Sequence, residues 1–398
     1  MNGHTLKRMN IRPHGVLVLA DGSVFEGELF GAATATSGEV VFNTALSGYQ
    51  EILTDPSYAG QIITFTNPHI GNYGVNAADF EARRLFCRGV VVRELARRPS
   101  SRRAEASLDA MLRTYGIPAI AGVDTRRLTR LIRDSGAIPG AIGPADRLAD
   151  LVIAAREEPG TDGIDLVAQV TTPEPYTVGS GEGFRIVAYD FGIKRTILRH
   201  LSTLGTVEVV PASTPAVDVL ARDPDGIFLS NGPGDPACVE GATETIGALL
   251  GAGVPVFGIC LGSQLLGRAL GGETVKLPFG HHGANHPVKD LTTGAIEITS
   301  QNHNFAVAID TLDGVADLTH VNLNDGVCEG MAARDANAFS VQHHPEAGPG
   351  PHDSSYLFAR FAERMVRHRG GGWAPAPAAM PLPAAEPAGL PAPERGVA

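Results

Sequence analysis

The stretch Val254-Pro-Val-Phe-Gly-Ile-Cys-Leu-Gly-Ser-Gln-Leu-Leu266 decides the fold of this chain. Its first half is apolar, as in a strand covered on both faces, and from Leu261 the apolar residues recur with helical spacing. Gly258 and Gly262 flank Cys260. Glycines permit the sharp strand-to-helix turn of a nucleophile elbow, and the helix N-terminus stabilises negative charge on the sulfur. The stretch therefore predicts a reactive cysteine at the corner.

Two other interpretations of the same stretch are open. Residues 245–267 carry no charge, as in a membrane helix, but Gly251, Gly253 and Pro255 would interrupt such a helix. A free cysteine in a core strand is also commonly just a small hydrophobic residue. The elbow by itself does not establish catalysis.

Length and composition restrict the class of protein. The chain has 398 residues, enough for two or three domains, with 43% hydrophobic and 19% charged residues and a formal net charge of -11. That charge argues against a nucleic-acid or anionic-membrane partner and leaves small molecules and proteins. The N-terminus lacks the apolar region of a signal peptide, so we expect a cytoplasmic protein.

The cysteines are widely separated and form no C-x-x-C pair, which argues against a zinc framework or a disulfide scaffold. They are Cys87, Cys238, Cys260 and Cys328. Three histidines, His281, His282 and His286, lie close together, but they have no helical frame and no carboxylate or thiol within ligand spacing. The sequence therefore predicts no metal site.

The first part of the chain predicts a mixed β/α domain over residues 1–170. A hairpin is expected with its turn at Asp21-Gly22, a loop over 48–74, and a helix capped by Asp124 and ended by Gly136. Further elements are expected as strands at 38–44 and 89–93 and a helix at 104–115. Residues 171–183 have the composition of a linker.

Residues 184–369 alternate between strand and helix patterns, which predicts a doubly wound, mostly parallel sheet with helices on both faces. The fold class is therefore α/β, and residues 370–398, rich in Pro, Ala and Gly, are expected to be disordered. Active sites in such sheets lie beyond the carboxyl ends of the strands. The loops expected there are 190–192, 230–236, the Cys260 elbow, 300–305 and 342–346.

A catalytic cysteine needs a base, and the base needs an orienting group. His344 and Glu346 supply both, because residues i and i+2 share a face in extended backbone and Pro345 favours that conformation. Glycines of the 230–236 loop, with the amide of Leu261, would form an oxyanion hole. The same loop could instead cradle phosphate, although it lacks the lysine and hydroxyl of a Walker loop. These residues predict acyl transfer through a thioester.

These motifs resemble those of class I, triad-type, glutamine amidotransferases. Further motifs, spread from Val16 to Phe361, resemble the small, glutamine-hydrolysing subunit of carbamoyl phosphate synthetase. They include Glu39-Val-Val-Phe-Asn-Thr44, Gly48-Tyr-Gln-Glu-Ile-Leu-Thr-Asp-Pro-Ser-Tyr58, Pro68-His-Ile-Gly-Asn72, Asp124-Thr-Arg126, Phe279-Gly-His-His-Gly283 and Pro349-Gly-Pro-His-Asp353. The resemblance includes an N-terminal domain that other amidotransferases lack, and implies that this domain faces the partner subunit.

The resemblance implies hydrolysis of L-glutamine to glutamate and ammonia, with Cys260 as nucleophile, His344 as proton carrier and Glu346 as orienting group. It implies that the following residues bind glutamine or its oxyanion: Ser57, Gly232, Gly234, Leu261, Gln264, Asn302, Asn304 and Phe305. It implies no cofactor in this chain. A large-subunit partner would hold ATP and Mg²⁺ and use the ammonia, delivered through a tunnel, to make carbamoyl phosphate for arginine and pyrimidine synthesis.

The sequence departs from that family at two positions: Ser263 stands where histidine is usual, and Asn304 where glycine is usual. Asparagine tolerates left-handed backbone, so a backbone contact at 304 is expected to survive. Ser263 cannot act as a base, which puts local tuning of Cys260 in question. Two alternatives stay open: a stand-alone thiol amidohydrolase of the same fold, and a catalytically weak scaffold subunit.

Overall fold

The computed structural model describes residues 12–370. The prediction that the N-terminus lacks a signal peptide concerns residues that lie mostly outside this range. The prediction that residues 370–398 are disordered also lies outside it, except at Gly370. No helix within residues 12–370 is both long and apolar enough to cross a membrane.

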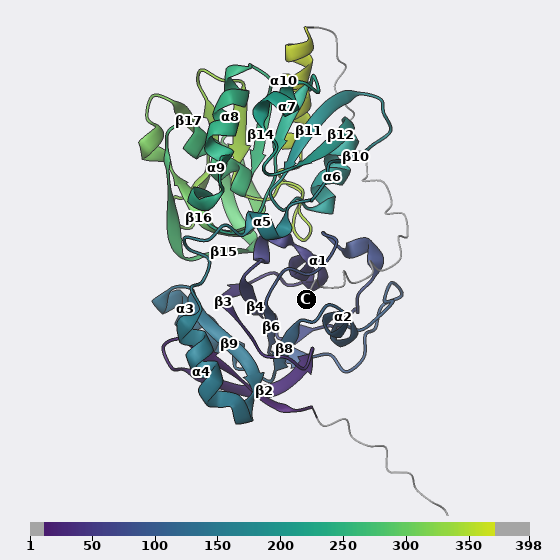
Figure 1. Ribbon diagram of the computed structural model, residues 1–398, viewed down its shortest axis with the longest axis vertical. Coiled ribbons are helices and arrows are strands. Elements are labelled where there is room, and N and C mark those ends of the chain that lie inside the picture. The colour runs from purple at the N-terminus through teal and green to yellow at the C-terminus, as the bar shows by residue number, and fades with distance from the viewer. Residues whose placement is uncertain (1–11, 371–398) are drawn as a thin grey trace, which may run out of the picture.

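Two units of structure make up the described chain, a closed barrel below and a large sheet with helices above (Figure 1). The barrel has the strand order β1-β2-β8-β6-β4-β3-β9. Its strands are β1 (His14–Leu19), β2 (Val24–Gly31), β3 (Thr36–Asn43), β4 (Gln61–Phe65), β6 (Gly89–Val92), β8 (Pro118–Ala121) and β9 (Ile138–Pro144). Outside it lie α1 (Tyr49–Thr54), β5 (His69–Ile70), β7 (Glu94–Leu95), α2 (Leu108–Thr114), α3 (Thr125–Ser135), α4 (Leu148–Glu157) and α5 (Val167–Val170).

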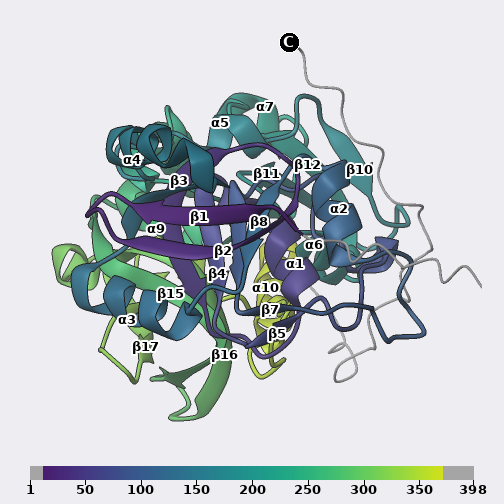
Figure 2. The same cartoon turned by 90° about the horizontal axis from the view of Figure 1, so that it is seen from below.

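The turn and helix-cap residues identified in the sequence of this unit lie at the hairpin and the helix that they predict. β1 and β2 form an antiparallel hairpin whose turn contains Gly22 at φ 89°, a value that favours glycine. α3 begins where the Asp124 side chain accepts a hydrogen bond from the N–H of Arg127 at 3.0 Å, and it ends at Gly136 at φ 93°. Seen from below, α4 lies alongside β1, where Leu151 packs on buried strand residues (Figure 2).

The prediction of a loop over residues 48–74 is wrong. This stretch contains α1, the short 3₁₀ helix η1 (Pro56–Tyr58), β4 and β5. All five residues of β4 are buried, and β4 pairs in parallel with both β3 and β6. The apolar run Ile62–Ile63 is too short to distinguish a buried strand from a loop by its periodicity.

The second unit is a ten-stranded sheet in the order β10-β12-β11-β13-β14-β19-β18-β17-β15-β16. Its strands are β10 (Tyr176–Val178), β11 (Phe184–Asp190), β12 (Gly205–Pro211), β13 (Gly226–Leu229), β14 (Val256–Ile259), β15 (Glu273–Asp290), β16 (Ile296–Ala308), β17 (Ala316–Asn322), β18 (Cys328–Ala333) and β19 (Ala338–Val341). The helices are α6 (Arg195–Ser202), α7 (Ala216–Leu220), α8 (Ala242–Gly251), α9 (Leu261–Ala269) and α10 (Tyr356–Arg369).

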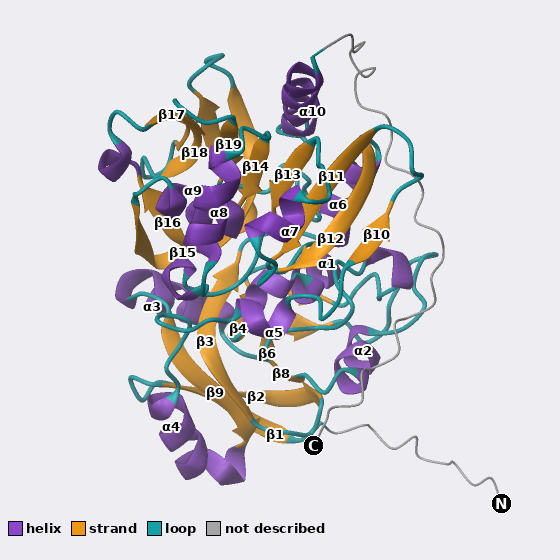
Figure 3. Ribbon diagram, turned by 45° about the horizontal axis from the view of Figure 1, so that its top comes forward, coloured by secondary structure: helices purple, strands orange, loops and turns teal. Residues whose placement is uncertain are grey.

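Strands β12, β11, β13, β14 and β19 run parallel, with helices on both faces as expected (Figure 3). Successive side chains of β11 alternate between the faces: Val187 packs with α7, α8 and α9, whereas Ile186 packs with α6 and α10. Because helices cover both faces of the sheet, successive residues of the central strands β13 and β14 are all buried, and the sequences of these strands are continuously apolar. Antiparallel strands extend the sheet on both sides.

Two stretches expected to lack regular structure contribute strands to this sheet. Residues 171–183 contain β10, which pairs with β12, and the boundaries of the predicted linker remain a prediction. The prediction of a loop at 300–305 is wrong, because these residues lie in β16, paired with β15. Their polarity reflects a buried polar site, since Gln301, Asn302 and His303 are all buried.

Candidate active site

Cys260 stands at a strained corner between β14 and α9. Its backbone has φ 54°, a rare value for a residue with a side chain, and its side chain is buried. The flanking glycines are required by close packing. A Cβ at Gly258 would lie 2.7 Å from the carbonyl oxygen of Gly262, and one at Gly262 would lie 2.1 Å from that of Leu229. The sequence elbow is thus a structural elbow.

Loops from neighbouring parallel strands meet at this corner. The N–H of Gly262 donates to the carbonyl of Ser230 at 3.0 Å, and the hydroxyl of Ser230 accepts from the N–H of Phe191, also at 3.0 Å. The N–H of Cys260 donates to the carbonyl of Val341 at 2.9 Å. The carboxyl ends of β11, β13, β14 and β19 therefore converge on the cysteine.

His344 and Glu346 lie together as predicted, but the extended backbone expected between them is wrong. Pro345 and Glu346 form a turn, in which the N–H of Ala347 donates to the carbonyl of His344 at 3.2 Å. Nδ1 of His344 is 2.7 Å from Oε1 of Glu346, whereas Nε2 has no hydrogen bond among the described residues. Burial alone would lower the pKa of His344, but the Glu346 carboxylate and the adjacent Cys260 sulfur outweigh burial and raise this pKa to about 10. The ring is thus oriented by Glu346 and interacts with Cys260 on its other side.

Lys194, at the start of α6, is a buried residue of the site that sequence reasoning missed. Its Nζ donates to Oε1 of Glu346 at 2.8 Å and to the carbonyl of Ala347 at 2.9 Å. Burial would raise the pKa of Glu346, but Lys194 and His344 lower it to about 2. Burial would lower the pKa of Lys194, but Glu346, Glu81 and Asp55 raise it. Glu346 is therefore an anion shared by two cations.

The structure brings the predicted glutamine-binding residues together beside Cys260. A small cavity, about 20 Å³, is lined by Ser57, Gly232, Gly234, Gln264, Asn302, Asn304 and Phe305, together with Cys260. Leu261 follows the cysteine, and its N–H, at the first position of α9, has no acceptor within the helix. The cavity holds about one water molecule, so these side chains must move to admit glutamine.

Buried hydrogen bonds from both structural units hold the pocket. Nδ2 of Asn231 donates to the Ser57 hydroxyl at 2.9 Å, and Nδ2 of Asn302 donates to Oδ2 of Asp55, also at 2.9 Å. Nε2 of Gln264 donates to the carbonyl of Phe305 at 2.8 Å. Asp55 is a second residue missed from sequence, although its Asp-Pro-Ser context identifies a 3₁₀-helix cap.

The two departures from the family pattern have structural explanations. Asn304 lies in β16 and is not among the described residues with positive φ, so the left-handed backbone considered for it is not used. Its Nδ2 donates to Oε2 of Glu39 at 2.8 Å, and its Oδ1 lies 2.9 Å from Nε2 of His282. The hydroxyl of Ser263 donates to that of Ser340 at 2.8 Å and is buried. Ser263 thus fastens α9 to β19.

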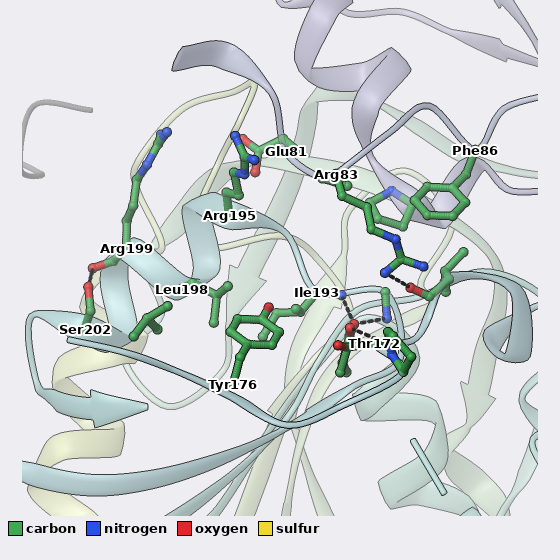
Figure 4. Close-up of a pocket in the computed structure, with 17 residues that line it drawn as sticks. Glu81, Arg83, Phe86, Thr172, Tyr176, Ile193, Arg195, Leu198, Arg199 and Ser202 are labelled. Carbon is green, nitrogen blue, oxygen red and sulfur yellow. Dashed lines mark hydrogen bonds between the residues drawn. The ribbon is translucent and has the colours of Figure 1, made fainter. Parts of the chain in front are cut away.

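A larger cavity, about 520 Å³, lies away from the nucleophile (Figure 4). Its wall combines Arg83 and Phe86 from the unit that contains the barrel with Tyr176 of β10 and Arg195 of α6 from the unit that contains the ten-stranded sheet. None of the predicted site residues lines it. Cavity size therefore does not locate the chemistry in this molecule.

The fold and this site define a class I glutamine amidotransferase. Residues 187–364 match the family model described as "Glutamine amidotransferase class-I". Residues 17–142 match the model described as "Carbamoyl-phosphate synthase small chain, CPSase domain".

Relatives over nearly the whole chain identify the family more narrowly. Carbamoyl phosphate synthase small chains from Polynucleobacter asymbioticus and Syntrophotalea carbinolica are 51% and 53% identical to this chain. The matches cover 89% of this chain in both cases, and 96% and 98% of the relatives. The small chain from Thermus thermophilus is 50% identical over 90% of this chain and 95% of its own length. The chain belongs to the carbamoyl phosphate synthase small-chain family.

Proposed function

We propose that the chain hydrolyses L-glutamine and delivers the ammonia to a large subunit that makes carbamoyl phosphate. The observation that carries the proposal is the convergence of Cys260, His344 and Glu346 at one sheet edge, beside a pocket of polar side chains. Membership of the small-chain family supports the substrate and the partner.

The first half of the reaction forms a thioester. The thiol proton lies on Nε2 of His344 before the reaction, as the raised pKa of this imidazole favours, and the sulfur of Cys260 attacks the side-chain carbonyl carbon of glutamine as a thiolate. His344 gives this proton to the departing nitrogen, which leaves as ammonia as the carbon–nitrogen bond breaks. The backbone N–H groups of Leu261 and Gly232 would stabilise the negative oxygen of the tetrahedral intermediate.

The second half releases glutamate. His344 takes a proton from water, the water oxygen attacks the thioester carbon, and the carbon–sulfur bond breaks, which restores the Cys260 thiolate beside protonated His344. Glu346 keeps the imidazole in one orientation throughout, and Lys194 keeps Glu346 ionised. Lys194 does not reach the reacting atoms in this scheme and acts as a positioning residue.

The remaining parts of the proposal concern the assembled enzyme. We assign no cofactor and no metal to the catalytic step in this chain, and place ATP and Mg²⁺ on the large subunit. Ammonia passed directly between the subunits would avoid protonation in water to unreactive ammonium. The cytoplasm is the proposed location, and nucleic acid and membrane are not proposed as partners.

The test is glutamate release by the purified chain, with and without the large subunit, for wild type, Cys260→Ser and Cys238→Ser. Cys238 is a free cysteine outside the site, so Cys238→Ser is a matched control. We expect activity that rises with the large subunit, disappears in Cys260→Ser and persists in Cys238→Ser. An equally active Cys260→Ser, or an inactive wild type with an active partner bound, would refute the assigned nucleophile.

A further inference from the structure

Three buried side chains, one of which (His303) also lines the glutamine pocket, bring possible metal-ligand atoms close together. They are His281 on β15, His303 on β16 and Glu329 on β18, and one ligand-type atom from each lies within 4.8 Å of the others. All three are buried, Glu329 completely. These residues are far apart in sequence, so the cluster is created by strand pairing, including the direct pairing of His281 with His303.

The hydrogen bonds of the two histidines fix which nitrogen is free in the neutral ring. Nε2 of His281 lies 2.7 Å from Oδ2 of Asp325, and Nδ1 of His303 lies 2.7 Å from the carbonyl oxygen of Phe305. Both oxygens only accept, so these two nitrogens carry the hydrogens. Nδ1 of His281 and Nε2 of His303 are left with lone pairs.

Each of these lone pairs lies near a further acceptor. Nδ1 of His281 lies 3.7 Å from Oε1 of Glu329. It accepts a long hydrogen bond, 3.4 Å, from Nδ2 of Asn322, whose other hydrogen goes to that same oxygen at 2.8 Å. Nε2 of His303 is 3.0 Å from Oε1 of Gln301, whose Nε2 donates to Thr299 and so fixes the amide orientation. Acceptors that lie close together in a buried space are stabilised by a proton or a metal ion between them.

A fourth buried side chain beside Glu329 has no hydrogen bond on its ring within residues 12–370. His343 is fully buried, and neither of its ring nitrogens has a hydrogen bond among the described residues. Its Nδ1 lies 3.6 Å from Oε2 of Glu329, an oxygen that also lacks a hydrogen bond. Separations of 3.6–3.7 Å are long for a hydrogen bond, but they approach those between ligands that share one ion at about 2.0–2.2 Å.

The other cluster of possible ligands on the described chain differs in this respect. Asp290, Glu297 and His320 also lie close together, but protein donors satisfy them. Thr292 and Arg360 bind Asp290, and Ser354 donates to Glu297 at 2.7 Å. Of these two clusters of described residues, only the one around Glu329 therefore has buried ligand atoms without a hydrogen bond.

We propose that His281 Nδ1, His303 Nε2 and the Glu329 carboxylate bind one divalent transition-metal ion of the zinc type, with His343 as a fourth ligand after a small shift. Two imidazoles and a carboxylate form a recurrent zinc set. The far nitrogens of His281 and His303 already have the carboxylate and carbonyl partners that orient metal-bound histidines. The sequence predicted no metal site because the carboxylate comes from a strand that is distant along the chain.

The ion would tie β15, β16 and β18 together beside the glutamine pocket. His282, Asn302 and Asn304, which line the pocket, alternate with the ligands along the same two strands. The proposed role is structural, and it does not depend on the catalytic mechanism.

The test is metal binding by the full chain, purified without a polyhistidine tag and stripped with a chelator. Cys260→Ser serves as the parent, so that zinc at the nucleophile is excluded. We expect one equivalent of Zn²⁺ to remain after gel filtration, and Co²⁺ to give visible absorption without a thiolate charge-transfer band. Glu329→Gln should weaken binding at least about tenfold, and His200→Gln, a histidine stacked on Phe358, should not.

Each other result contradicts the site. A parent chain that retains no stoichiometric Zn²⁺ would mean that protons alone satisfy the cluster. Equal Zn²⁺ affinity in Glu329→Gln would place the ion elsewhere. Should Glu329→Gln fail to fold, the melting temperature of the parent decides: it must fall on chelation and recover with Zn²⁺, and a temperature that does not respond overturns the proposal.

Discussion

Replacing Lys194 with methionine removes a buried charge while keeping most of the side-chain volume. Both partners of the Lys194–Glu346 pair are almost completely buried, with side-chain exposures of 3% and 0%. Removing one member of such a pair leaves the other as an uncompensated charge, which costs about 3–5 kcal/mol. We expect Lys194→Met to lower the free energy of unfolding by this amount, and to slow glutamate release because His344 loses a firmly held partner.

Urea unfolding and glutamate-release assays at pH 7 measure both effects, with Lys289→Met as the control for loss of a lysine charge. In a Glu346→Gln background the stability cost of Lys194→Met should be much smaller, because no buried anion remains at that position. A stability loss below about 0.5 kcal/mol in the wild-type background would refute the reasoning. So would an equal loss in both backgrounds.

Three further predictions concern the same region. Folding lowers the pKa of Glu346 from 4.5 to about 2, so the stability that the ionised carboxylate contributes is present above pH 4.5 and is lost as the pH falls towards 2. Between these two pH values, urea unfolding should show wild type losing about 3 kcal/mol of stability relative to Glu346→Gln. Parallel curves of stability against pH would contradict this prediction. Gly262→Ala places a Cβ 2.1 Å from a β13 carbonyl oxygen and should lower the free energy of unfolding by about 1–3 kcal/mol or more. The control Gly247→Ala has open space around it in α8 and should not destabilise the chain. Equal urea midpoints for the two variants would show that the elbow can relax around the methyl group. Ser263→Ala breaks the hydroxyl bond to Ser340 and should cost about 0.5–1.5 kcal/mol in unfolding while leaving kcat nearly unchanged, so a large change in kcat would assign Ser263 to the chemistry.

The parts of the site that sequence predicts are those encoded within a few residues. The elbow needs only glycines two residues on either side of Cys260, and Glu346 approaches His344 within a single turn. The hairpin at Gly22 and the helix after Asp124 are local in the same sense. Such features are determined by the geometry of a few neighbouring residues and can be predicted without knowledge of tertiary packing.

The residues that sequence reasoning missed depend on contacts between distant segments. A lysine before a helix normally predicts a solvated charge, and only the packing of α6 against the His344 loop buries Lys194. Glu329 likewise comes close to His281 and His303 only through strand pairing, of β15 with β16 and of β17 with β18. In β16, polar residues around Asn302 were interpreted as a loop because polarity alone does not distinguish a solvated turn from a buried site. The catalytic and binding roles themselves stay predictions until they are assayed.

The bond between Asp55 and Asn302 joins residues 247 positions apart, one from each structural unit. The pocket is therefore complete only when the two units are docked, and the chain resembles two binding partners joined by a tether. Because the connecting chain makes the docking of the two units intramolecular, this docking depends on their effective concentration and needs little affinity between the units themselves. If the connecting chain were cut, the substrate would act as a molecular glue, because glutamine binds the docked pair and by mass action draws the two fragments together.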